Sequence, residues 1–125
     1  MYKIMLADDE GIVIDSLKFI IEKEFKDTCE VQYAKTGRSV IELAESFRPD
    51  VAVMDIQMPE MDGYEATKRI RNLDDARADI PIVAMTANVF EEDRQKALES
   101  GMNAHVSKPV DMNMLFKVMA QILKK

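Results

Sequence analysis

The chain has 125 residues and a formal net charge of −6; 47% of its residues are hydrophobic and 32% are charged. This size fits one globular domain, over residues 1–125, with enough apolar side chains to build a core. The negative charge argues against direct binding of nucleic acid, and no apolar run approaches the roughly 18 residues of a membrane span. Because the single cysteine, Cys29, fits a reducing compartment, we expect a cytoplasmic protein without membrane contact.

Five short runs, taken in chain order, predict strands. Each run is followed by a segment in which apolar residues recur at helical spacing. The predicted strands are 4–7, 29–34, 51–54, 80–85 and 104–106, and the helical segments lie within 13–25, 40–47, 66–73, 89–98 and 115–122. Continuous apolar runs are typical of strands buried on both faces of a parallel sheet, whereas the alternation in 29–34 indicates an edge strand. Pro81 lacks a backbone donor and is expected at or near a strand start.

The resulting order is strand then helix, repeated five times. Strand–helix–strand connections are right-handed and produce parallel sheets covered by helices on both faces. We therefore predict an α/β fold with a doubly wound, five-stranded parallel sheet, a (βα)5 three-layer sandwich.

Polar and charged residues follow four of the five predicted strands. Asp8-Asp9-Glu10 follows the first strand, Asp55 the third, Thr86 the fourth and Lys108-Pro109 the fifth. Because the carboxyl ends of parallel strands share one edge, where ligands bind in open sheets, we expect these side chains to lie together.

This group of residues suits phosphoryl chemistry with a hard cation. Clustered carboxylates raise each other's pKa unless a cation compensates them, and Mg²⁺ takes oxygen ligands while leaving a position for a phosphate oxygen. Lys108 is suited to contact a phosphate as a point charge, Thr86 offers a hydroxyl, and Ala87 a backbone N–H. A carboxylate such as Asp55 is a competent nucleophile toward phosphorus.

The sequence resembles the receiver (CheY-like) family of two-component response regulators over essentially its whole length. Four motifs carry this resemblance at the ends of predicted strands. They are Leu6-Ala7-Asp8-Asp9-Glu10, Val53 to Gly63, Ala84-Met85-Thr86-Ala87, and Gly101-Met102 to Ser107-Lys108-Pro109.

The resemblance implies a flavodoxin-like strand order 2-1-3-4-5 and assigns a role to each matching residue. Asp55 would be the phosphoacceptor, and Lys108-Pro109 would be a cis peptide. Mg²⁺ would be bound by Asp9, by Asp8 directly or through water, by Asp55 and by the backbone carbonyl of Gln57. Thr86, Ala87 and Lys108 would contact the phosphoryl group.

The family's switch position, three residues before the lysine, is occupied by His105 instead of the more frequent Tyr or Phe. In related receivers this ring moves inward when the threonine, here Thr86, moves to the phosphoryl group. An imidazole also gains a proton in the physiological pH range, which predicts a pH effect on switching.

The implied function is a signalling switch in a phosphorelay. A sensor histidine kinase or a phosphotransfer protein would donate the phosphoryl group, and the face of the fourth helix, fifth strand and fifth helix would change. That face would control an output domain or a partner protein, as a monomer or as a phosphorylation-dependent homodimer. The sequence of residues 2–10 resembles that of receivers that precede DNA-binding output domains. The sequence of residues 58–105 resembles instead that of receivers fused to hybrid histidine kinases. The chain would catalyse only its own modification, so we do not expect an enzyme in the usual sense.

Three other functions fit less of the sequence. A haloacid-dehalogenase-type phosphatase needs a second Asp two residues after the nucleophile, where this chain has Gln57. A nucleotide or flavin carrier needs a Gly-rich loop after the first strand, where Asp8-Asp9-Glu10 stands instead. A docking module without phosphorylation would usually lack one residue of the set.

Each candidate residue also has an ordinary structural explanation. The acids at 8–10 suit the start of a helix, Asp55 a turn, Thr86 a helix cap, Lys108 a solvated surface and His105 a strand. Their joint placement at one predicted edge is what favours a site.

Overall fold

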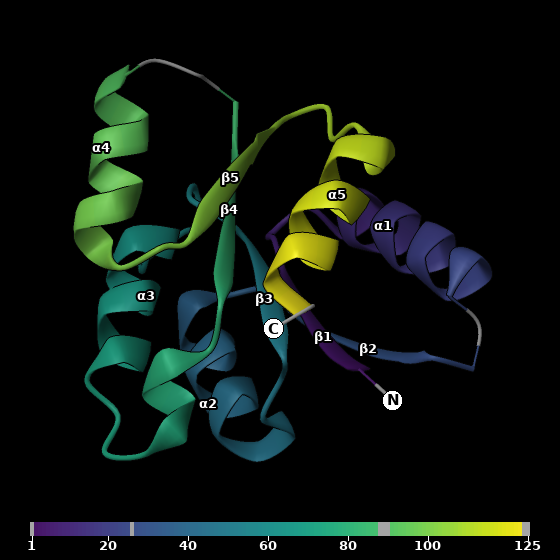
Figure 1. The fold of residues 1–125 in the computed structure, drawn as a ribbon. Coiled ribbons are helices and arrows are strands. Elements are labelled where there is room, and N and C mark those ends of the chain that lie inside the picture. The colour runs from purple at the N-terminus through teal and green to yellow at the C-terminus, as the bar shows by residue number, and fades with distance from the viewer. Residues whose placement is uncertain (1, 26, 88–90, 124–125) are drawn as a thin grey trace.

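A parallel five-stranded sheet in the order β2-β1-β3-β4-β5 forms the centre of the computed structural model, which describes residues 2–25, 27–87 and 91–123 (Figure 1). The strands are β1 Tyr2–Ala7, β2 Cys29–Ala34, β3 Val51–Asp55, β4 Ile82–Thr86 and β5 Ala104–Ser107. Every neighbouring pair is parallel. The predicted α/β fold and strand order are confirmed.

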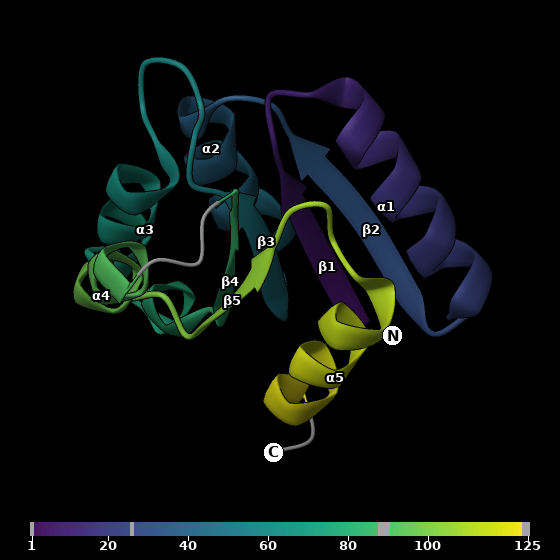
Figure 2. The same cartoon turned by 90° about the horizontal axis from the view of Figure 1, so that it is seen from above.

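Helices cover both faces of the sheet. They are α1 Gly11–Glu24, α2 Gly37–Phe47, α3 Gly63–Arg71, α4 Glu91–Ser100 and α5 Met112–Leu123, with a short 3₁₀ helix, η1, at Ala76–Asp79. Viewed from above, α1 and α5 lie on one side of the sheet and α2, α3 and α4 on the other (Figure 2). No helix among the described residues is long and apolar enough to cross a membrane.

Successive residues of the central strands supply two separate cores. Met5 and Met54 pack on the side of α2 and α3, while their neighbours Leu6 and Val53 pack on the side of α1 and α5. This alternation explains why β1, β3 and β4 read as continuous apolar runs, since both faces of each strand are buried. Burying one such side chain contributes about 1.5–3 kcal/mol.

Three details differ from the sequence-based prediction. The fourth strand begins at Ile82, because η1 occupies the residues up to Asp79 and Pro81 cannot donate to the ladder. Tyr33 is 49% exposed on edge strand β2, where Lys35 Nζ lies 6.0 Å from its ring centroid. Leu98 of the predicted fourth apolar face is 63% exposed, and Val89 and Phe90 of that face lie outside the described residues.

Side-chain caps fix the starts of the two helices nearest the carboxyl edge of β2 and β3. Thr36 Oγ1 accepts from Ser39 N at the start of α2, and Asp62 Oδ1 accepts from Glu65 N at the start of α3. Each cap satisfies one backbone donor that the first turn leaves without a partner. The loop between β3 and α3 is thereby held at its α3 end.

Arg71, at the end of α3, is hydrogen-bonded to two other segments of the fold. Its guanidinium donates to the carbonyl oxygens of Gly101, Ala78 and Ile80 at 2.7–3.0 Å and to Asn103 Oδ1 at 2.9 Å. Burial lowers the pKa of Arg71. This residue therefore ties α3 to η1 and to the turn between α4 and β5.

Candidate functional site

The carboxyl ends of β1, β3, β4 and β5 bring the predicted residues to one edge of the sheet. Ala7 pairs with Met54, and Asp55 pairs with Met85, so that Asp8, Asp55 and Thr86 follow one another across three adjacent strands. Asp8 is fully buried, Asp55 is 4% exposed and Thr86 is 5% exposed. Three polar side chains are thus withdrawn from water at one place.

Lys108 supplies a cation between the two buried carboxylates. Its Nζ lies 2.8 Å from Asp8 Oδ2 and 2.9 Å from Asp55 Oδ2. Glu10 Oε1 lies farther away, 3.8 Å from the same nitrogen. Asp8, Asp55 and Lys108 thus lie together at the predicted edge, and Glu10, which also suits a helix start, approaches the same ammonium.

The two aspartates are oriented by the same type of hydrogen-bonded turn. Asp55 Oδ1 accepts a hydrogen bond from Gln57 N at 2.9 Å, and Asp8 Oδ1 accepts one from Glu10 N at 2.9 Å. Such turns form because a short Asp side chain reaches the backbone two residues ahead. Each carboxylate is held by one oxygen and presents the other, Oδ2, to Lys108.

The buried charges shift one another's proton affinity. Burial raises the pKa of Asp55, and nearby Asp8 adds to this, although the hydrogen bonds from Gln57 and Lys108 act in the opposite direction. For Lys108, burial favours the neutral amine, but the carboxylates of Asp8 and Asp55 outweigh it and raise the pKa of the ammonium. The site therefore holds a charged Lys108 beside an Asp55 that is unusually easy to protonate.

Gly63 lets α3 begin directly against the backbone of Asp55. A Cβ atom at this glycine would lie 2.5 Å from the carbonyl oxygen of Asp55 and 2.8 Å from Ile56 Cα. The Gly63 N–H donates to the Ile56 carbonyl at 3.1 Å, which closes the loop between β3 and α3. The absence of a side chain at position 63 is thus part of what positions Asp55.

Carboxylate oxygens near this edge form a group suited to a hard cation. One oxygen each from Asp8, Asp9 and Glu10 lies within 4.8 Å of the others. Asp8 Oδ2 is buried, and the partner that the described residues offer it is the Lys108 ammonium, at 2.8 Å. Mg²⁺ and Ca²⁺ prefer such oxygen donors. Gln57 lies beside Asp55, to which its backbone N–H donates.

The remaining predicted residues lie beside the buried pair. Ala87 is exposed at the bend that follows β4. His105 is half-buried on β5 and lines a narrow cleft of about 10 Å³ together with Thr86. The Lys108–Pro109 peptide is cis, as predicted.

Comparison with known proteins identifies the family. The sequence model of the response regulator receiver domain matches residues 4–120. The chain belongs to the response regulator receiver family. In general terms it is therefore a phosphoacceptor signalling domain of two-component systems.

Relatives of this receiver differ in total length. The polar-differentiation response regulator DivK of Brucella anthropi is 31% identical over 109 residues, which cover 87% of this chain and 85% of DivK. The transcription factor SKN7 of Saccharomyces cerevisiae is 32% identical over 98% of this chain, but the matched region spans only 19% of SKN7.

Among solved structures, the receiver domain of the sensor histidine kinase PA1611 of Pseudomonas aeruginosa PAO1 superimposes with a TM-score of 0.87. The two chains are 27% identical and cover 99% and 98% of each other. That structure contains a magnesium ion coordinated in its active-site cleft.

Proposed function

We propose that this receiver accepts a phosphoryl group on Asp55 and acts as a Mg²⁺-dependent signalling switch. The observation that carries the proposal is the position of Asp55: a buried carboxylate at the end of β3, with Oδ2 2.9 Å from Lys108 Nζ. A nucleophile needs a fixed orientation, which the Gln57 N–H provides, and the transferred group needs a nearby positive charge, which Lys108 provides.

In the reaction, Asp55 Oδ2 would form a bond to phosphorus while the bond from phosphorus to the donor breaks. Lys108 Nζ would move from its carboxylate partners to the incoming phosphoryl oxygens, to which an ammonium binds as a point charge. Thr86 and the backbone N–H of Ala87 would contact other oxygens of the same group. The position of Asp55 at the carboxyl end of β3 supports its role as the phosphoacceptor.

Four groups are proposed to hold the metal: the carboxylates of Asp8, Asp9 and Asp55 and the backbone carbonyl of Gln57. The oxygen-only donor set and the buried Asp8 Oδ2 support this assignment. When bound, Mg²⁺ would offset the negative charge of the acids and of the phosphoryl oxygens. The magnesium ion in the PA1611 receiver supports the same choice of cation.

The proposed donor is a phosphohistidine on a sensor kinase or phosphotransfer protein, and the proposed responding surface consists of α4, β5 and α5. His105 would couple the two, because it lies on β5 and shares a cleft with Thr86. The chain would modify only itself and would not turn over an external metabolite. Release of phosphate from generic phosphate esters over many turnovers would contradict this.

Intact-mass spectrometry after incubation with acetyl phosphate and Mg²⁺ tests the proposal. We expect one phosphoryl adduct that requires Mg²⁺ and is absent in Asp55→Asn. Asp50→Asn is the matched control, since Asp50 is an exposed aspartate at the opposite end of the same strand, and it should retain the adduct.

Because rapid hydrolysis can hide an adduct, thermal unfolding with Mg²⁺ and beryllofluoride, a phosphoryl mimic, complements the mass measurement. We expect stabilisation of the wild type and of Asp50→Asn but not of Asp55→Asn. No adduct together with no stabilisation would overturn the proposal and would favour a docking module without phosphorylation.

A further inference from the structure

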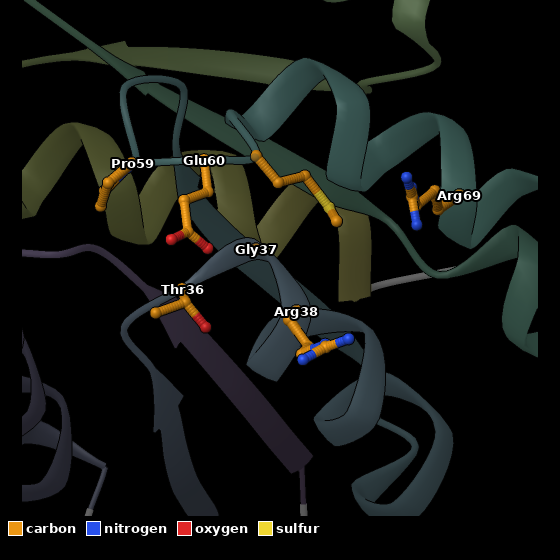
Figure 3. Close-up of a pocket in the computed structure, with 7 residues that line it drawn as sticks. Thr36, Gly37, Arg38, Pro59, Glu60 and Arg69 are labelled. Carbon is orange, nitrogen blue, oxygen red and sulfur yellow. The ribbon is translucent and has the colours of Figure 1, made fainter.

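A second hollow, of about 350 Å³, lies between the start of α2 and the loop that precedes α3 (Figure 3). Its lining comprises Thr36, Gly37, Arg38, Pro59, Glu60, Met61 and Arg69. Figure 3 shows the guanidinium groups of Arg38 and Arg69 along one side of the hollow, while the carboxylate of Glu60 faces Thr36 and Gly37. Two positive groups and one negative group thus line the hollow, in a chain whose net charge is −6.

The charged side chains of this hollow make few ion pairs or hydrogen bonds within the fold. Neither Arg38 nor Glu60 makes an ion pair or side-chain hydrogen bond with any described residue. Arg69 has one partner, Glu65, at 3.5 Å, and both side chains of this pair are at least half exposed. Exposed pairs of this kind are weak, so the guanidinium of Arg69 is available to another anion.

The walls of the hollow are held in place by direct contact between α2 and the loop. A Cβ atom at Gly37 would lie 2.5 Å from Met61 Cβ and 2.7 Å from the Met61 carbonyl oxygen, so the two segments touch without an intervening side chain. Glu60 itself adopts a left-handed backbone conformation with φ 66°. The arginines therefore flank a preformed cavity and not a gap that must first open.

We propose that this hollow binds a small molecule that carries a carboxylate or phosphate group. The guanidinium of arginine presents a planar fork of N–H donors that matches both groups, and two such groups line this hollow. The volume lies at the lower end of the range for small-molecule pockets, which favours a compact anion. This inference does not depend on phosphorylation of Asp55.

Nuclear magnetic resonance of the ¹⁵N-labelled chain tests whether the hollow binds an anion. Glutarate and inorganic phosphate would be titrated separately, without Mg²⁺ and at constant ionic strength, while the side-chain Nε–Hε signals of Arg38 and Arg69 and the amide of Gly37 are followed. We expect saturable shifts at these three residues with at least one anion. The two titrations show which of the two chemical groups is preferred, and signals near Lys108 report phosphate bound at the other site.

Three substitutions at the hollow and one control substitution give the expected changes in affinity. Arg38→Gln should weaken binding roughly fivefold, the size of one exposed charge interaction, and Glu60→Gln should tighten it because a repelling carboxylate is removed. Arg38→Lys, which keeps the charge but loses the fork, should fall between wild type and Arg38→Gln. Arg48→Gln makes the same charge change at the opposite end of α2 and should leave binding unchanged.

Shifts that grow linearly with anion concentration would overturn the proposal. So would an equal loss of binding in Arg38→Gln and Arg48→Gln, because general attraction of anions to positive charge would then explain the shifts. Unchanged amide spectra outside the hollow verify that each variant is folded.

Discussion

The ammonium of Lys108 lies 2.9 Å from Asp55 Oδ2, although 53 positions separate the two residues in the sequence. The same nitrogen lies 2.8 Å from Asp8 Oδ2. One cation therefore compensates two carboxylates that the ends of β1 and β3 withdraw from water. Removing the cation leaves two buried carboxylates uncompensated, whereas removing one carboxylate relieves an excess of negative charge, and these two cases lead to the first two predictions.

Lys108→Met should lower the free energy of unfolding at pH 7 by about 2 kcal/mol, because Asp8 and Asp55 lose their counter-charge. The pKa of Lys108 is raised in the folded state, so its stabilising contribution is present at neutral pH and is lost only as the pH rises through that raised pKa. Urea unfolding measures the effect. Lys117→Met, at an exposed position of α5, is the control; an equal loss in both variants would contradict the prediction.

Asp55→Asn should stabilise the metal-free protein at pH 7 by about 1 kcal/mol, because an ionised, buried carboxylate is replaced by a neutral amide. The pKa of Asp55 is raised by burial, so the wild-type protein loses stability as the pH rises through that pKa. The advantage of the variant should therefore disappear as the pH falls and Asp55 gains a proton. Thermal unfolding of both proteins between pH 4 and pH 8 tests this. If the stability advantage of Asp55→Asn grows toward low pH, the pKa of Asp55 is not raised by folding.

Gly63→Ala should destabilise the chain by about 2–3 kcal/mol and slow any modification of Asp55, because the new methyl group meets backbone atoms of Asp55 and Ile56 that have no freedom to move aside. Gly11→Ala is the matched control. A Cβ atom there would meet only the end of the Lys35 side chain, at 3.3 Å, which is able to rotate away. Comparable unfolding midpoints for the two variants, measured in urea, would refute this account of position 63.

Arg71→Gln should lower the free energy of unfolding by about 2–3 kcal/mol, because several partly buried carbonyl oxygens lose a charged donor at once. Arg69→Gln, two residues earlier on the same helix, removes only an exposed pair and should change stability by less than about 0.5 kcal/mol. Hydrogen exchange would show whether backbone amides lose protection at the turn between α4 and β5, where Arg71 contacts Gly101. Equal effects of the two substitutions would contradict the role assigned to Arg71.

The order of the elements, and the edge at which polar residues gather, could be predicted from the amino-acid sequence alone. Apolar runs such as Val51 to Met54 are continuous because both faces of a central strand are buried, and this local pattern is visible without coordinates. Parallel strands place their carboxyl ends at one edge, so Asp8, Asp55, Thr86 and Lys108 could be assigned to one site from spacing alone.

Which side chains contact one another depends instead on how the elements pack. The approach of Glu10 to Lys108, the contact of Gly63 with the backbone of Asp55, and the carbonyl oxygens gathered by Arg71 join segments that carry no shared local signal. The exposure of Leu98 and Tyr33 likewise depends on how far neighbouring elements extend over each position. Periodicity describes the environment of a residue along its own element, whereas contacts between elements depend on packing in three dimensions, which one sequence does not encode locally.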